Sequence, residues 1–227
     1  MNQLTFNFLA AGKPTSNSVR INELIIAGWT GRNPDAVEAH IRELEALGIS
    51  RPKTVPVFYR VSNSLLTTGP AIQVAGTGST GEAECVVLQF DDGLWIGTGS
   101  DMTDRILERT SITLSKQACP KPIAPTLWRY EDVAGHWDDL LLRSFATING
   151  ERRLYQEGSV SQILAPETII KMYSHAKMAP GSAMFCGTLP TLGEIEFATR
   201  FEIVLEDPHL QRSIEHGYEI ISLPINE

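Results

Sequence analysis

The chain has 227 residues, with 27 acidic and 19 basic side chains and a formal net charge of -8 at pH 7. This acidity, together with the lack of any Lys- or Arg-rich run, excludes a surface built to bind nucleic acid. No stretch has the length of a membrane span and the start, MNQLTFNFLAAGKP, lacks the pattern of a signal peptide, so we expect a cytoplasmic protein without membrane contact.

The first fifty residues contain two strand patterns and then a helix pattern. Residues 3–8 (QLTFNF) and 21–29 (INELIIAGW) are typical of short strands. Asn33 suits an N-cap, Pro34 suits the first helical position, and Gly48 favours a helix end. The buried stripe of this helix is expected to consist of Val37, Ile41, Leu44 and Leu47.

Two residues of this helix could form an acid/base pair. His40 falls in the sector of the apolar stripe, and Glu43 lies at its edge, three residues further on. A carboxylate beside an imidazole raises its basicity and fixes its orientation, which a general acid/base dyad requires. The alternative is a surface histidine paired with the helix's own glutamate, and the helix taken alone favours that alternative.

From residue 55 onward the sequence is mostly strand and turn. The segments VPVFYRVS, AIQVAG, AECVVLQF and LWIGTG are typical of short strands. Residues 81–101, GEAECVVLQFDDGLWIGTGSD, should form a hairpin, because Asp92-Gly93 is a strong signal for a two-residue turn. In that register Glu84 lies opposite Asp101.

The hairpin would gather three acids on one patch. Strand alternation places Glu82 and Glu84 on the same face, and Asp101 joins them from the returning strand. Like charges opposite one another destabilise a sheet, and a hard divalent cation such as Mg²⁺, Mn²⁺ or Ca²⁺ would relieve the repulsion. The alternative is a solvated strand face that merely displays acids, and the spacing leaves both interpretations open.

The later segments complete a β-dominated α+β class. Asn149-Gly150 predicts a second hairpin, Pro166 opens a short helix, and residues 194–207 (EIEFATRFEIVLED) predict one long strand. We expect N-terminal strands and a lid helix over 1–50, and a β domain over 51–227 that forms one structural unit with them. The three cysteines are interpreted as reduced packing residues, at positions Cys85, Cys119 and Cys186.

Seven motifs, in order, resemble those of the fumarylacetoacetate hydrolase (FAH) family. They extend from about Ile26 to Gly193 and are GWTGRNPDAVEAHIRE, VFYRVSNSLL, GEAE, GSDMTDR, SKQACPKPIAP, INGERRLYQEGSVSQ and CGTLPTLG. No single motif is specific, but the ordered set is, and the sequence looks closest to a bacterial branch known only as a domain of unknown function. The resemblance implies a mixed β roll or sandwich with few short helices, an N-terminal lid, a metal at its open end and a homodimer.

The resemblance also implies roles for individual residues. Glu82, Glu84 and Asp101 match the carboxylates that bind Mg²⁺ or Mn²⁺, which favours the cation interpretation of the hairpin. His40 and Glu43 match the lid dyad that activates water or moves protons. A further catalytic residue is implied at Lys116, in a loop near metal and substrate. The residues implied for substrate contact are Tyr59, Arg60, Arg105, Gly187 and Thr188.

The sequence departs from the family pattern at several points. Arg60 stands where many relatives have lysine, which suits a differently shaped anion because a guanidinium binds carboxylates bidentately. The segment before His40 is longer than in the family, and CGTLPTLG is longer than the family's turn. Asp104 replaces a small residue and would add an acid near the site.

The chemistry implied is metal-dependent hydrolysis of a carbon-carbon bond in a 2,4-dioxo acid or acylpyruvate-like small organic acid, through a metal-stabilised enolate, in catabolism. The same scaffold would support a lyase or isomerase, such as a 2-oxo-alkenoate hydratase, an oxo-acid decarboxylase or a tautomerase. A non-catalytic metabolite-binding protein is the alternative outside enzymes. Zinc chemistry is disfavoured because the other histidines lack ligand spacing; these are His136, His175, His209 and His216.

Overall fold

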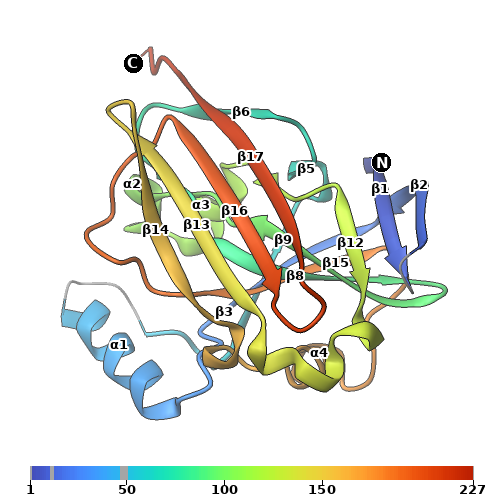
Figure 1. Ribbon diagram of the computed structural model, residues 1–227. Coiled ribbons are helices and arrows are strands. Elements are labelled where there is room, and N and C mark those ends of the chain that lie inside the picture. Colours follow the sequence, from blue (N-terminus) through green and yellow to red (C-terminus); the bar gives the residue numbers. More distant parts are fainter. Residues whose placement is uncertain (1, 11–12, 47–50, 227) are drawn as a thin grey trace.

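The computed structural model describes residues 2–10, 13–46 and 51–226 of the chain. Two curved β-sheets dominate it, and its helices are short (Figure 1). The strands of the larger sheet are β1 (Asn2–Ala10), β2 (Lys13–Ile21), β3 (Glu23–Gly28), β4 (Val57–Val61), β8 (Ala83–Phe90), β9 (Gly93–Ser100), β12 (Thr126–Arg129) and β15 (Ser182–Thr188). Those of the smaller sheet are β6 (Ala71–Ala75), β13 (Leu141–Ile148), β14 (Glu151–Ser159), β16 (Arg200–Asp207) and β17 (Arg212–Leu223).

The strand order shows that segments far apart in the sequence are neighbours in each sheet. The larger sheet runs β2-β1-β12-β9-β8-β15-β3-β4, and the smaller runs β14-β13-β16-β17-β6. Strands of the predicted lid segment therefore share a sheet with strands of the predicted β domain. Two short ladders add β5 (Leu66–Thr67) to β11 (Lys121–Pro122), and β7 (Ser79–Thr80) to β10 (Thr103–Asp104). The helices are α1 (Pro34–Ala46), α2 (Arg105–Glu108), α3 (Ile112–Gln117) and α4 (Pro166–Ser174), with 3-10 turns at Asn63–Leu65, Tyr130–Asp132, Ala134–Asp139 and Val160–Gln162. The predicted β-dominated α+β class is confirmed.

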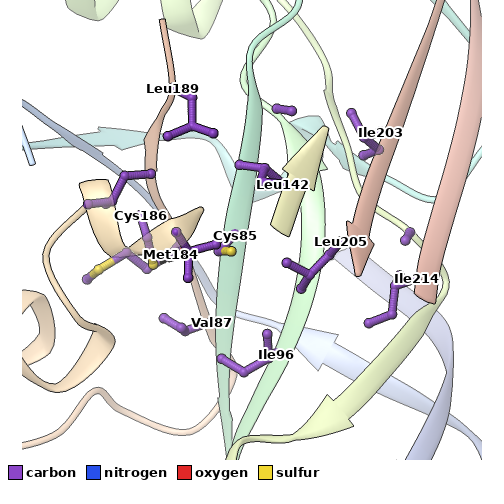
Figure 2. Close-up of a cluster of buried hydrophobic side chains, with 14 of the residues drawn as sticks. Cys85, Val87, Ile96, Leu142, Met184, Cys186, Leu189, Ile203, Leu205 and Ile214 are labelled. Carbon is purple, nitrogen blue, oxygen red and sulfur yellow. Dashed lines mark hydrogen bonds between the residues drawn. The ribbon is translucent and has the colours of Figure 1, made fainter. Parts of the chain in front are cut away.

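The core lies on both faces of the larger sheet. Between the sheets, Cys85 and Val87 of β8 belong to the same apolar cluster as Leu142 and Leu205 of the smaller sheet (Figure 2). Val86, the intervening residue of β8, belongs to a second cluster with Phe6, Phe8 and Leu24. Strand alternation thus buries β8 on both sides, which explains its continuous apolar run. The three cysteines are free and buried, as expected for packing residues.

The two predicted hairpins have different outcomes. Asn149 and Gly150 both adopt positive φ, 52° and 83°, and Ile148 pairs with Glu151, so the β13–β14 turn is confirmed. In the acidic hairpin, however, the turn consists of Asp91 and Asp92, and Phe90 pairs with Gly93.

The predicted register of the acidic hairpin is therefore wrong by two residues. Glu84 lies opposite Gly99 rather than Asp101. Positive φ in this turn falls on Gly93 alone, at 131°, so the turn is not the predicted type. Because a shift of two residues preserves the face of every side chain, the acids still meet.

The N-terminal elements match the prediction in part. The Asn33 side chain accepts hydrogen bonds from the backbone N–H groups of Asp35 (3.0 Å) and Ala36 (3.3 Å), so the helix start is confirmed. Ile41 is buried, but His40 is exposed and does not share its sector. The predicted helix end at Gly48 and the stripe position Leu47 lie outside the described residues, as does the side chain of Leu44.

The strand predictions missed several elements, β12 and β15 among them, and made one strand too long. Strand β2 was missed because KPTSNSVRI is polar and contains a proline, as edge strands often are. Strand β17 was missed as well, and the long strand predicted over 194–207 is confined to β16. None of the helices in the described ranges is long and apolar enough to cross a membrane.

Candidate metal centre and active site

Three acids converge where the acidic hairpin opens. Glu84 lies within β8, Glu82 just precedes that strand, and Asp101 just follows β9. The backbone N–H of Asp101 donates to the carbonyl of Glu82 at 2.9 Å, which joins the two chain ends. One carboxylate oxygen from each residue lies within 4.8 Å of the others. We call Glu82, Glu84 and Asp101 the acidic triad.

Glu84 and Asp101 are almost completely removed from solvent. Glu84 is 2% exposed and accepts a hydrogen bond from the Gly187 N–H at 2.7 Å. Burial, followed by the charge of Asp101, raises the pKa of Glu84 well above its usual value. Burial would also raise the pKa of Asp101, but the ammonium groups of Lys116 and Lys121 outweigh it and lower that pKa. The pair therefore favours one charged and one protonated carboxyl.

Two acids of the triad form ion pairs with basic side chains. Asp101 forms a short ion pair with Lys116, and its Oδ1 lies 3.4 Å from the Lys121 ammonium. Glu82 pairs with Arg105 at 2.9 Å. Arg105 also pairs with Glu108, so four carboxyl groups and three basic groups share the cluster, and a bound divalent cation would leave it with one net positive charge when all four carboxyls are ionised.

The donor set fits a hard divalent cation. Carboxylate oxygens are the ligands that Mg²⁺ and Mn²⁺ prefer, and three of them leave coordination positions for other ligands. The buried Oδ1 of Asp101 has no hydrogen-bond partner within the described parts of the chain, although buried carboxylate oxygens are normally satisfied. An oxygen of this kind, beside a second buried acid, can take a metal ion without breaking an existing hydrogen bond.

Lys121 is a site residue that the sequence reasoning missed. It is fully buried and donates to the carbonyls of Met102 (2.7 Å), Cys119 (2.9 Å) and Lys116. These bonds tie the segment after α3 to the segment after β9, and Asp101 lies between them. The only signal in the sequence was a second lysine, five residues after Lys116 in SKQACPKPIAP.

Lys116 lies on helix α3 rather than in the loop that the resemblance implied. Burial would lower the pKa of its ammonium, but Asp101 and then Glu82 raise it above its usual value. A lysine held protonated at this position supplies a permanent positive charge within reach of the triad.

Arg105 is fully engaged behind the triad. Its Nε donates to the Thr80 hydroxyl at 2.6 Å, and its terminal nitrogens pair with Glu82 and Glu108 at 2.9 Å each. The arginine therefore orients Glu82 and is not presented to a ligand. Asp104 caps α2 by accepting from two backbone N–H groups of that helix, so it is not an additional acid of the site.

The turn after β15 closes another side of the site. The Thr188 hydroxyl donates to the Ala83 carbonyl at 2.8 Å and accepts from the Gln156 side chain at 2.7 Å. Gln156 is buried, and its amide oxygen also accepts from the Ala83 N–H at 2.9 Å. Gln156 belongs to the INGERRLYQEGSVSQ motif, but the sequence does not predict its role, which depends on strands that meet only in the fold.

Tyr59 and Arg60 lie on opposite faces of β4, as strand alternation requires. The ring of Tyr59 lies 5.8 Å from the Lys116 ammonium, on the side of the triad. Arg60 pairs with Glu23 and donates to the Tyr173 hydroxyl at 3.1 Å. The structure therefore brings Tyr59, but not Arg60, toward the acids.

The dyad of α1 lies apart from the triad. His40 Nδ1 is 3.4 Å from Glu43 Oε2, and the two side chains are 61% and 74% exposed. No hydrogen bond or ion pair among the described residues joins either side chain to the three acids. The His40 ring contacts Trp29, with ring centroids 5.6 Å apart.

A family model described as "Protein of unknown function (DUF2848)" matches residues 27–218, which include the acidic triad and its basic neighbours. The chain belongs to the DUF2848 family. A search of curated proteins found no match for this DUF2848 chain.

Solved structures identify the fold of this DUF2848 protein. Fumarylpyruvate hydrolase from Pseudomonas aeruginosa, in complex with Mn²⁺ and pyruvate, aligns with a TM-score of 0.62 and 18% identity over 96% of this chain and 97% of that one. An isomerase of 2-hydroxyhepta-2,4-diene-1,7-dioate from Mycobacterium marinum gives 0.66 and 15% over 93% and 82%. A yeast FAH family protein gives 0.64 and 19% over 91% and 95%. The structural neighbours are FAH-family proteins, and the predicted FAH-like fold is confirmed.

Proposed function

We propose that this protein is a divalent-metal-dependent hydrolase that cleaves a carbon-carbon bond in a 2,4-dioxo acid or acylpyruvate-like small organic acid. Glu82, Glu84 and Asp101 would hold Mg²⁺ or Mn²⁺, with Ca²⁺ as a weaker candidate. The observation that carries the proposal is the buried triad, in which Asp101 Oδ1 accepts no hydrogen bond from the described residues and Lys116 pairs with Oδ2. The solved neighbours with hydrolase and isomerase names support enzyme chemistry of this type.

The charge of the site favours an anionic substrate. Without a metal ion, the basic groups of Arg105, Lys116 and Lys121 already offset most of the negative charge of the triad and of Glu108. When bound, a divalent cation supplies an excess of positive charge that polarises carbonyl oxygens and stabilises the negative charge that develops on them. A 2-oxo carboxylate carries one negative charge, which suits this positive charge, and the cation and the Lys116 ammonium would stabilise the second negative charge that develops in its enolate.

The chain's own residues have distinct parts in this proposal. Lys116 is a fixed positive charge next to the developing enolate. The turn formed by Gly187 and Thr188 contacts the substrate's carboxylate side, and Tyr59 lines the site. His40 takes a proton from water at Nε2, because its Nδ1 faces Glu43. Helix α1 must therefore approach the triad when substrate binds.

A second candidate is a lyase or isomerase, which the exposed position of His40 favours. A tautomerase or decarboxylase needs enolate stabilisation but no attacking water, so it can function without the dyad. A metabolite-binding protein would keep the metal site and lack turnover altogether. The His40 side chain therefore separates the three candidates.

The experiment is turnover of acylpyruvates by metal-loaded wild type, His40→Ala and His209→Ala. His209 is a matched control, because it is a half-exposed histidine that pairs with a carboxylate, Asp139, at 2.9 Å. A hydrolase should lose about 10²–10⁴-fold in kcat with His40→Ala and nothing with His209→Ala. Full activity of His40→Ala would remove the dyad from the mechanism, and loss of metal binding in that variant would contradict its role as a proton carrier alone.

We further propose that the protein is a cytoplasmic homodimer that takes part in catabolism of small organic acids. Large apolar side chains are exposed near the triad's arginine, on α2 and on the segment after β15, and they would be covered by a second copy; these are Ile106, Leu107, Leu192, Ile195 and Phe197. Light scattering should give twice the 25.0 kDa mass of the chain. A mass of one chain at micromolar concentration would contradict the dimer.

A further inference from the structure

Trp29 adopts a backbone conformation that its side chain disfavours. Its φ is 61°, in the left-handed region that bulky L-residues rarely enter. The residue lies between Gly28, the last residue of β3, and the segment that leads into α1. It therefore lies in the connection between the larger sheet and α1, the helix that carries His40 and Glu43.

Fixed neighbours impose this conformation. On one side, Gly28 pairs with Val57 in the larger sheet. On the other, the Thr30 hydroxyl donates to the Cys186 carbonyl at 2.7 Å, and the Thr30 carbonyl accepts from the Leu164 N–H at 2.8 Å. Strained residues persist only when the surrounding structure determines them from several sides, and they concentrate at functional sites.

The indole of Trp29 contacts both parts of the proposed active site. Toward the triad, it lies beside the Tyr59 side chain, whose ring lies 5.8 Å from the Lys116 ammonium. Toward α1, its ring centroid lies 5.6 Å from that of His40. Gly28 permits the close approach of Tyr59, because a Cβ at that position would lie 3.0 Å from the tyrosine ring.

These contacts form one continuous path from a buried acid to an exposed base. Asp101 pairs with Lys116, Lys116 faces Tyr59, and Trp29 lies between Tyr59 and His40. Because the backbone on both sides of Trp29 is anchored, the indole has a defined place against which α1 can pack. Glycines flank the Trp-Thr pair in the sequence GWTG, so no side chain on either neighbouring position competes with the indole for space.

We propose that Trp29 is a positioning residue, whose strained backbone holds the indole between Tyr59 and His40 and thereby sets where helix α1 stands relative to the triad. In this role Trp29 acts through His40 and does not touch the reacting atoms. The inference rests on the proposed function for its catalytic readout, but the placement of α1 is measurable without any substrate.

The experiment compares Trp29→Gly, Trp29→Phe and Gln211→Gly with wild type. Glycine relaxes the backbone and removes the indole, whereas phenylalanine keeps a smaller aromatic ring without the N–H donor. Gln211 is a matched control for relaxing the backbone, because it is exposed and has a φ of 50° in a turn far along the chain. Amide hydrogen exchange of α1 and of β8, thermal midpoints, and kcat and KM on acylpyruvates are measured for each protein.

Without substrate, Trp29→Gly should speed amide exchange in α1 by about tenfold and leave β8 unchanged, while its thermal midpoint stays at or above the wild-type value. The exchange rate of α1 in Trp29→Phe should fall between those of wild type and Trp29→Gly, and Gln211→Gly should exchange like wild type. Unchanged exchange in α1, or a thermal midpoint that falls together with protection in β8, would overturn the proposal.

With substrate, Trp29→Gly should lower kcat by about tenfold or more and change KM by less than about threefold. In a His40→Ala background the same substitution should have almost no further effect, because both changes remove one function. Additive losses would overturn action through His40. If wild type turns over no acylpyruvate, the proposed function fails, and the exchange result still decides the role of Trp29.

Discussion

Replacing Asp101 with asparagine tests whether the buried cluster is organised by charge. The substitution keeps the shape of the side chain but removes the negative charge that two ammonium groups share. Asp101 is fully buried, Lys116 pairs with its Oδ2, and the Lys121 ammonium lies 3.4 Å from its Oδ1. Asparagine would leave both lysines buried without that partner.

The size of the effect follows from these contacts. At an effective dielectric constant of about 20, one ion pair at 3.4 Å is worth about 5 kcal/mol, and removing one partner from a buried pair costs about 3–5 kcal/mol. Burial already lowers the pKa of Lys121, so the variant can release a proton there, and this limits the cost. We therefore expect a loss of about 3–5 kcal/mol in the free energy of unfolding, or about 6–20 °C in the thermal midpoint.

Thermal and urea unfolding of metal-stripped protein measure this loss. Asp104→Asn is the matched control, since Asp104 is also mostly buried but serves as an N-cap, where asparagine is equally suitable. The control should change stability by less than about 0.5 kcal/mol. If Asp101→Asn is as stable as Asp104→Asn, the charge reasoning is refuted.

Two further predictions concern the carboxylate Glu84 and its neighbour Gly187. Gly187→Ala should destabilise the protein by about 2 kcal/mol or more and weaken Mn²⁺ binding, because φ is 110° there and an added Cβ would lie 1.9 Å from the Thr30 hydroxyl. If the variant unfolds like wild type and binds Mn²⁺ as tightly in calorimetry, this prediction is wrong. The raised pKa of Glu84 means that the folded, metal-free protein retains a proton that the unfolded chain releases above pH 4.5, so this residue's contribution to stability falls as pH rises through the folded pKa. Metal-stripped Glu84→Gln should therefore gain stability relative to wild type as pH increases, and a difference that is independent of pH would contradict the assignment.

The sequence predicted that the three acids lie together, although the predicted turn was wrong, because the error of two residues is one full period of a strand. Placing the turn at Asp92-Gly93 moved the register by two residues, yet Glu84 kept its face and Asp101 still followed the partner strand. A shift of one residue would have put Glu84 on the opposite face. Agreement on the triad therefore depended on parity as well as on the hairpin signal.

Residues whose roles depend on long-range contacts could not be found in this way. Gln156 joins Ala83 and Thr188, from strands far apart in the sequence, and Lys121 satisfies its ammonium with backbone carbonyls that carry no residue signature. Arg60 follows Tyr59 directly, so both could never face the same side of β4.

Helix periodicity likewise could not predict that His40 is exposed. An apolar stripe predicts which face of a helix is buried only when the helix packs along its length. Helix α1 lies at the periphery of the fold in Figure 1, and Ile41 is its buried apolar residue among those described, while His40 on the adjacent position faces solvent.

The central claim is a metal-dependent site for a 2-oxo acid, and isothermal titration of metal-stripped protein tests it most directly. Mg²⁺ and Mn²⁺ are titrated into wild type and Glu82→Ala, alone and with oxalate as a mimic of the enolate. The account predicts that wild type binds the cation, that oxalate binds only when the cation is present, and that Glu82→Ala binds neither. Wild-type protein that binds no divalent cation would contradict the account, because the acids would then form only an internal ion-pair cluster.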